Sequence, residues 1–140
     1  MSVTRTAIRH LAANLLQASG TVAATSVFRE PTGELKQDEY PAMVVFPKDE
    51  EVTEPISSHP PEYERAFVLV VESRAKGNNG LYDRLESMAD TADQVMHGLP
   101  LAGEPRLVRV VLQGAEYEID DEADPVIGRL RHTYLVVYDA

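Results

Sequence analysis

The feature that most constrains this chain is an uninterrupted apolar run, AFVLVV, at residues 66–71. Successive side chains of a β-strand point to opposite faces of the sheet, so this run is apolar on both faces. We therefore expect a long strand over Glu64–Ala75, with one face covered by a helix and the other by a helix or a neighbouring subunit. The run is far too short to span a membrane, which takes about 20 apolar residues in a helix.

Two other segments, Val3–Gln17 and Leu81–His97, show the three- and four-residue spacing of amphipathic helices. The first 29 residues contain no Asp or Glu but three arginines, a composition that an organelle transit peptide shares. We expect instead that they begin the folded domain. In the second helix, an apolar stripe opposes a solvent-facing side made of Asp83, Glu86, Asp90 and Asp93.

The remaining regular segments favour β-strands, and they fix the fold class. They are Ala24–Arg29, Ala42–Pro47, Ile127–Tyr138, and the pair Leu107–Leu112 and Ala115–Asp120 separated by a bulge at Gly114. The order is therefore α-β-β-β-α-β-β. Strands joined by short turns on either side of one helix predict an α+β domain with a mainly antiparallel sheet and two helices. A length of 140 residues suits a single domain over 1–140.

The polar segment Lys48–Arg65 contains Pro55, Pro60 and Pro61, so we expect regular structure to be broken there. It is too long for a tight turn, and long ordered loops usually have a function. We expect it to form an arm that leaves the domain.

The stretch EYEIDDEAD, Glu116–Asp124, places six acids in nine residues. A calcium-binding loop counted from Asp120 needs Gly at its sixth place and Glu at its twelfth, where this chain has Pro125 and Arg131. That pattern fails, and only a weak Ca²⁺ or Mg²⁺ site shared with other loops remains open.

The alternation within this stretch is more informative than its total charge. Glu116, Glu118 and Asp120 share one strand face, while Tyr117 and Ile119 share the other, which we expect to be buried. The carboxylate row is either a solvated face or the lining of a surface that repels anions.

Arg129 and Arg131 share one face of the following strand. If that strand pairs with the acidic strand as a hairpin, cross-strand ion pairs follow. If the two strands face another subunit, the same charges form an inter-subunit contact, and both alternatives remain open.

Composition and motifs exclude several function classes. A net charge of −10 disfavours broad binding to nucleic-acid phosphates or to anionic membranes. The absence of cysteine excludes thiol catalysis and thiolate zinc sites. No nucleophile elbow, zinc-protease, phosphate-loop or dinucleotide motif is present. We therefore expect no enzyme activity, cofactor or metal, and we expect structural or surface roles for the scattered histidines His10, His59, His97 and His132.

Six segments in this order resemble the tail terminator family of long-tailed phages, the group that includes the lambda-type minor tail protein U. They are TAIRHLAANLL, YPAMVVFPKDEEVTE, PPEYERAFVLVVESRAKG, LYDRLESMADTADQVM, VRVVLQGAEYEID and IGRLRHTYLVVYD. The resemblance covers nearly the whole chain, and the order and character of the segments carry it.

The resemblance implies a non-enzymatic α+β subunit that forms a homo-hexameric ring on the completed tail tube. Such a ring stops polymerisation of the tube protein and offers a joining surface to the head-completion and neck proteins. The genome DNA passes through its pore without specific binding. The implied location is the virion tail at the tail–neck junction, with assembly in the host cytoplasm.

Within that framework we expect two groups of functional residues. The pore-facing acids are Glu116, Glu118, Asp120, Asp121, Glu122 and Asp124, and the inter-subunit contacts are Asp49, Glu50, Glu51, Glu64, Arg65, Arg129 and Arg131. The alternatives are another neck or tail-completion protein of similar fold, and a small-molecule-binding α+β dimer with an apolar cavity and convergent polar groups.

Overall fold

The computed structural model describes residues 2–19, 27–28, 40–58, 61–77, 79–101, 107–123 and 125–139, and side chains for fewer of them. Five strands form one sheet in the order β1-β2-β3-β5-β4, with β1 parallel to β2 and the other pairs antiparallel. The α+β class is confirmed, and the observed order differs from the expected one by a short 3₁₀ helix, η2. The elements are α1 (Ser2–Ala18), β1 (Val27–Phe28), β2 (Ala42–Ser58), β3 (Pro61–Lys76), α2 (Leu81–His97), η2 (Leu99–Leu101), β4 (Leu107–Asp120) and β5 (Ile127–Asp139).

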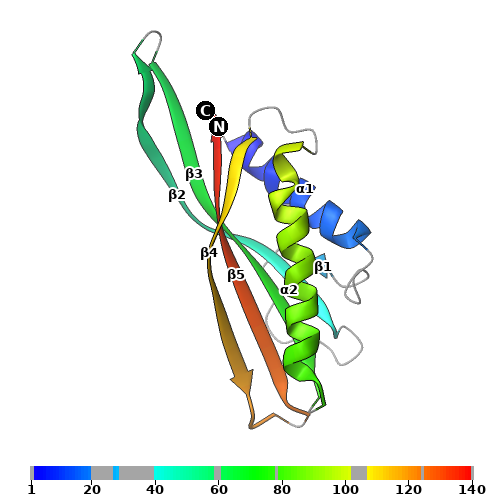
Figure 1. The fold of residues 1–140 in the computed structure, drawn as a ribbon. Coiled ribbons are helices and arrows are strands. Elements are labelled where there is room, and N and C mark those ends of the chain that lie inside the picture. Colours follow the sequence, from blue (N-terminus) through cyan, green and yellow to red (C-terminus); the bar gives the residue numbers. More distant parts are fainter. Residues whose placement is uncertain are drawn as a thin grey trace.

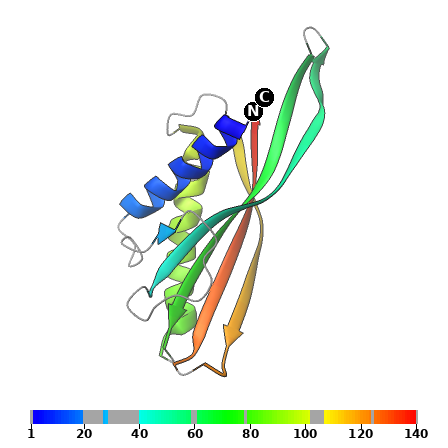
Figure 2. The same cartoon turned by 180° about the vertical axis from the view of Figure 1, so that it is seen from behind.

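Both helices lie on the same face of the sheet, as Figures 1 and 2 show from opposite sides. α1 packs on β1, β2 and α2, whereas α2 packs on β3, β4 and β5. The interpretation that a second helix covers the far face of β3 is therefore wrong, and cover by a neighbouring subunit stays a prediction. On the helix-covered face, β3 contributes Phe67, Leu69 and Val71 to the main core.

The N-terminal helix belongs to this core. Ile8, Ala12 and Leu16 of α1 are completely buried and pack in one cluster with Met88 and Met96 of α2. α1 therefore supplies apolar side chains that the folded domain buries.

The expected break in regular structure between Lys48 and Arg65 is wrong. β2 and β3 continue as paired strands to Ser58 and from Pro61, with irregular register between Pro47 and Glu50 and on both sides of Pro55. Such bulges accommodate a proline that cannot donate a ladder hydrogen bond. β2 and β3 form a hairpin, and β5 pairs with β3 only as far as Glu64. The distal end of this β2–β3 hairpin therefore extends beyond the rest of the sheet as an arm (Figure 1).

Gly128 of β5 lies beneath the first turns of α2. A Cβ atom at this position would come within 2.9 Å of Leu85 Cδ1, 3.0 Å of Leu81 Cδ2 and 3.2 Å of Ile119 Cδ1. The absence of a side chain therefore sets how closely this end of α2 approaches the sheet.

We expect Gly128→Val to lower the free energy of unfolding by about 1–3 kcal/mol, because the added methyls overpack this contact. Gly114→Val is the matched control, since a Cβ there meets nothing within 4 Å, and it should change stability by less than about 0.5 kcal/mol. Urea denaturation measures both. Equal losses in the two variants would contradict the proposed close packing.

Candidate functional site

The face of the sheet turned away from the helices carries an ordered set of charges. In one cross-strand row Arg131 lies between Glu116 and Glu72, and in the next row Arg129 lies between Glu118 and Arg74. Cross-strand neighbours of this kind share a face of the sheet. We call these six side chains the charged face. Their formal charges sum to zero, because three are arginines and three are glutamates.

Arg131 is the centre of the charged face. Its Nε donates to Glu72 Oε2 at 2.5 Å, its Nη1 to Glu116 Oε1 at 3.3 Å, and its Nη2 to Glu118 Oε2 at 2.5 Å. Glu72 is only 2% exposed and also pairs with Arg74. The guanidinium of Arg131, on β5, thus joins one carboxylate of β3 and two of β4 through charge-assisted hydrogen bonds.

Arg129 makes a weaker contact, with its Nη1 3.5 Å from Glu118 Oε1. The predicted cross-strand ion pairs are therefore present within one chain. A further contact of Arg129 or Arg131 with another subunit stays a prediction.

The pKa values of Glu118 and Arg131 on this face are shifted by their mutual contact. The hydrogen bond from Arg131 and then its charge hold the pKa of Glu118 below its ordinary value. Burial acts to lower the pKa of Arg131, but its hydrogen bonds to Glu72 and Glu118 outweigh that effect and raise it. The carboxylate row is consequently neither simply solvated nor simply anion-repelling, because arginines of β3 and β5 neutralise much of it.

The other predicted pore residues lie at the turn between β4 and β5. Asp120 Oδ1 accepts the Glu122 N–H at 3.2 Å, and Asp121 and Glu122 are exposed. Asp124 lies outside the described residues. The backbone of Asp49, Glu50, Glu51, Glu64 and Arg65 belongs to the hairpin strands, but their side chains also lie outside the described residues.

The predicted alternation along β4 is observed, but the expected burial of Tyr117 is wrong. Tyr117 is 44% exposed and Ile119 is half-buried. β4 is an edge strand, and α2 covers it incompletely. Tyr117 instead packs edge-to-face on Tyr82 of α2, with 5.4 Å between the ring centroids.

The sequence analysis missed a polar cluster between α2 and β5. Asp93, expected on the solvent side, is half-buried, and its Oδ1 lies 2.8 Å from His132 Nδ1 and accepts the hydroxyl of the fully buried Tyr134. Burial and then the Asp93 carboxylate raise the pKa of Tyr134. The helical spacing could have predicted that Asp93 faces the sheet. It lies four residues after Ala89 and three before Met96, both of which are buried.

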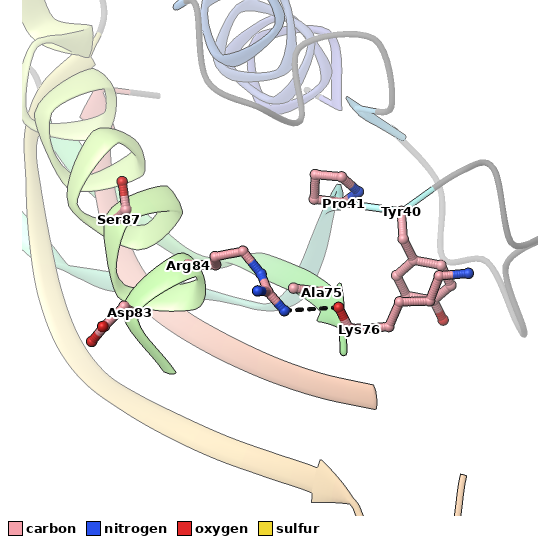
Figure 3. A pocket seen from close by; sticks show the side chains of 7 residues that line it. All are labelled: Tyr40, Pro41, Ala75, Lys76, Asp83, Arg84 and Ser87. Carbon is pink, nitrogen blue, oxygen red and sulfur yellow. Dashed lines mark hydrogen bonds between the residues drawn. The ribbon is translucent and has the colours of Figure 1, made fainter. Parts of the chain in front are cut away.

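A cavity of about 520 Å³ opens where the start of α2 faces the beginning of β2 and the end of β3 (Figure 3). Its cations already have partners in the chain. Lys76 Nζ lies 5.2 Å from the centroid of the Tyr40 ring, and Arg84 Nη2 donates to the Lys76 carbonyl at 2.8 Å. The other lining residues are Pro41, Ala75, Asp83 and Ser87.

Within the described part of the chain, no three His, Asp or Glu side chains are grouped so that they could hold a metal ion. Neither described helix has the length and apolar character needed to cross a membrane.

Comparison with known proteins gives a match in structure but not in sequence. No protein-family model matches the chain, and no curated protein matches it. The fold is similar to that of a chain in the solved "Virion of native gene transfer agent (GTA) particle", with a TM-score of 0.59 and 16% sequence identity. The match covers 93% of this chain and 94% of that one. At this identity the similarity shows a shared fold.

We expect Arg131→Leu to lower the free energy of unfolding by about 2–3 kcal/mol, because it removes a hydrogen-bond partner from the buried Glu72 carboxylate. Arg129→Leu is the control and should cost no more than about 1 kcal/mol, since its pair is longer and half-exposed. Chemical denaturation of both variants gives the comparison. An Arg129 variant at least as unstable as the Arg131 variant would show that Arg131 is not the centre of this network.

The lowered pKa of Glu118 also predicts a pH dependence. Its ionised form adds stability above the ordinary carboxyl pKa of 4.5, and this contribution is lost as the pH falls through the lower folded pKa. Glu118→Gln should therefore be less stable than the unmodified chain at pH 7, by less than about 1 kcal/mol. The difference should vanish at strongly acidic pH. Denaturation from pH 7 to pH 2 tests this, and a difference that persists at the lowest pH would refute it.

Proposed function

We propose that this chain is a structural virion protein that forms a ring on the end of a tail tube and terminates the tube. The observation that carries the proposal is a shared fold over nearly the full length of both chains with a component of a virion. The sequence resemblance to tail terminators supplies the finer assignment. In this role the chain acts by assembling with other virion proteins and catalyses no reaction.

Ring formation is supported by the asymmetry of the fold. The subunit has an arm, the distal β2–β3 hairpin, on one side and an edge strand, β4, on the other side of the sheet. Contacts between two different surfaces of identical subunits generate a ring when the rotation closes. Six copies would close the ring, and a ring that docks on the tube through one face and offers no copy of that face ends the polymer.

The acids have a consistent place in this proposal. The pore must pass DNA without holding it, so its lining must lack the exposed cations that bind phosphates. On the charged face each arginine described above already contacts a carboxylate, and the β4–β5 turn adds Asp120, Asp121 and Glu122. We place this face and turn toward the pore, at a tail–neck junction that meets the tube protein below and the head-completion proteins above. Assembly takes place in the host cytoplasm.

Two alternative functions have different degrees of support from the structure. Another neck or tail-completion protein of the same fold would share the ring and the charge pattern, and only its position in the particle would differ. A small-molecule-binding dimer gains support from the cavity beside α2. Its polar groups do not converge on an empty centre, however, because Arg84 and Lys76 already contact the chain itself. We therefore favour assembly over ligand binding.

The test is to polymerise the tail tube protein of the same virion, with and without the purified chain, and to measure tube lengths by negative-stain microscopy. We expect shorter tubes that carry a ring at one end, and a solution mass near six subunits by light scattering for the ring. An equal concentration of heat-denatured chain is the control. Unchanged tube lengths with bare ends would contradict tail termination.

A further inference from the structure

The outer edge of β4 has no partner strand in the described part of the chain. Its second half carries three acids at alternate positions in 116–120, and charges of this kind discourage a further strand from pairing. Its first half has no acid and exposes apolar side chains instead, Val111 at 42% and Leu112 at 36%. The segment 109–112, which we call the open edge, is therefore the part of β4 suited to contact with another chain.

Arg109 is the charged residue of the open edge. Its side chain is exposed and forms no ion pair with any described side chain. In the sheet Arg109 lies opposite Val137 of β5, Val137 lies opposite Ala66 of β3, and Ala66 lies opposite Glu51 of β2. One cross-strand row thus begins with a cation at one edge of the sheet and ends with an acid at the other.

At the level of Glu51, β2 is itself an edge strand, because β1 pairs with it only at Met43 and Val44. Glu51 lies at the base of the hairpin arm, and the hairpin segment 49–65 contains six acids and one arginine. The two ends of the row are therefore complementary in charge. The acids in 116–120 repel the same hairpin, which confines the contact to the open edge.

Arg109 and Glu51 cannot meet within one chain. Two strands lie between β2 and β4, so the ends of the row are separated by three strand spacings, about 14 Å. The hairpin arm and the start of β4 lie on opposite sides of the end of β5 in both views (Figures 1 and 2). A contact between these two residues therefore joins two copies of the chain.

Pairing of β4 with β4 of a second copy is the competing arrangement. Two antiparallel β4 strands would also bring Arg109 near an acid, such as Glu118. The register shift between Leu112 and Gly114 would then lie in the middle of the pairing on both chains and interrupt it. Contact with the hairpin uses only the open edge, which lies between this shift and the one before Arg109.

We infer that Arg109 on β4 of one copy binds Glu51 on β2 of the next, and that the base of that hairpin covers Val111. This inference rests on the proposed ring, and it names the head-to-tail contact that closes it. The contact is heterologous, because the open edge and the hairpin are different surfaces of one subunit.

Charge reversal tests the pairing. Arg109→Glu and Glu51→Arg should each raise, at least tenfold, the protein concentration at which half of the chains are in rings, because like charges then meet. The chain that carries both reversals should return to within about threefold of the unmodified chain. Since the two residues lie far apart in one chain, such recovery comes from contact between copies. Light scattering over a dilution series measures all four chains.

Glu86→Arg is the matched control, because it makes the same change in net charge on the exposed side of α2. It should shift the assembly concentration by no more than about twofold, since surface charges away from a contact contribute little. Circular dichroism melts of each variant establish that it folds. A double reversal that fails to recover, although it is folded, would overturn the predicted pairing.

Crosslinking gives a second, independent readout, and the absence of cysteine makes it specific. Chains carrying Arg109→Cys are oxidised with chains carrying Glu51→Cys, or with chains carrying Glu118→Cys, under conditions in which the ring forms. We expect the mixed disulfide with Glu51→Cys in at least tenfold excess on a non-reducing gel. An equal or greater yield with Glu118→Cys would overturn the inference in favour of pairing between two β4 strands.

The tube assay separates the two proposals. Single reversals that form rings and shorten tubes as well as the unmodified chain does would retain the proposed function and reject the pairing of Arg109 with Glu51. An unmodified chain that stays monomeric at every concentration and leaves tube ends bare rejects both.

Discussion

The burial of both helices on one face of the sheet is the constraint from which the rest of the structure follows. Phe67, Leu69 and Val71 of β3 face that side and join side chains of α1 and α2 in the main core. Alternate residues of the same strand, Glu72 and Arg74, point the other way. The sheet therefore has one apolar face that makes the domain and one partly charged face that no described helix covers.

The charged face is stable because its charges are matched within the sheet. A buried carboxylate such as Glu72 is costly unless several donors satisfy it, and Arg74 and Arg131 do so from two strands. The strand order β3-β5-β4 places Arg131 between acids on both sides. A face built in this way is hydrophilic without being strongly anionic, which suits a surface that passes or touches a charged polymer without retaining it.

The three surfaces outside the core lie in different parts of the fold. The β2–β3 hairpin extends beyond the sheet, the edge strand β4 and its acidic turn lie at the opposite side, and the Tyr82–Tyr117 pair lies between α2 and β4. The proposed ring needs two different contact surfaces on each subunit, and these parts of the fold differ from one another. The cavity beside α2 is a secondary feature, since its two cations already contact the chain itself: Arg84 donates to the Lys76 carbonyl, and Lys76 lies over the Tyr40 ring.

Sequence reasoning was most accurate where one periodicity dominated. The stripe of Leu85, Met88 and Met96 predicted α2, and the alternation of Glu116 and Glu118 predicted which side chains of β4 share a face. It was least accurate in the segment 48–65, where the proline count predicted irregular structure. The strands continue there because bulges absorb the missing donor, and bulges depend on the partner strand rather than on local composition.

The sequence by itself therefore determined the α+β class, the two helices and the alternation of acids and apolar residues, since these depend on local spacing along the chain. Only the tertiary structure decided that both helices share a face, that Asp93 meets His132 and Tyr134, and that Arg131 joins Glu72 to Glu116 and Glu118. The physical reason is that strand order and register bring together side chains as far apart as residues 72 and 131. No periodicity within a single segment records which strand will lie beside it.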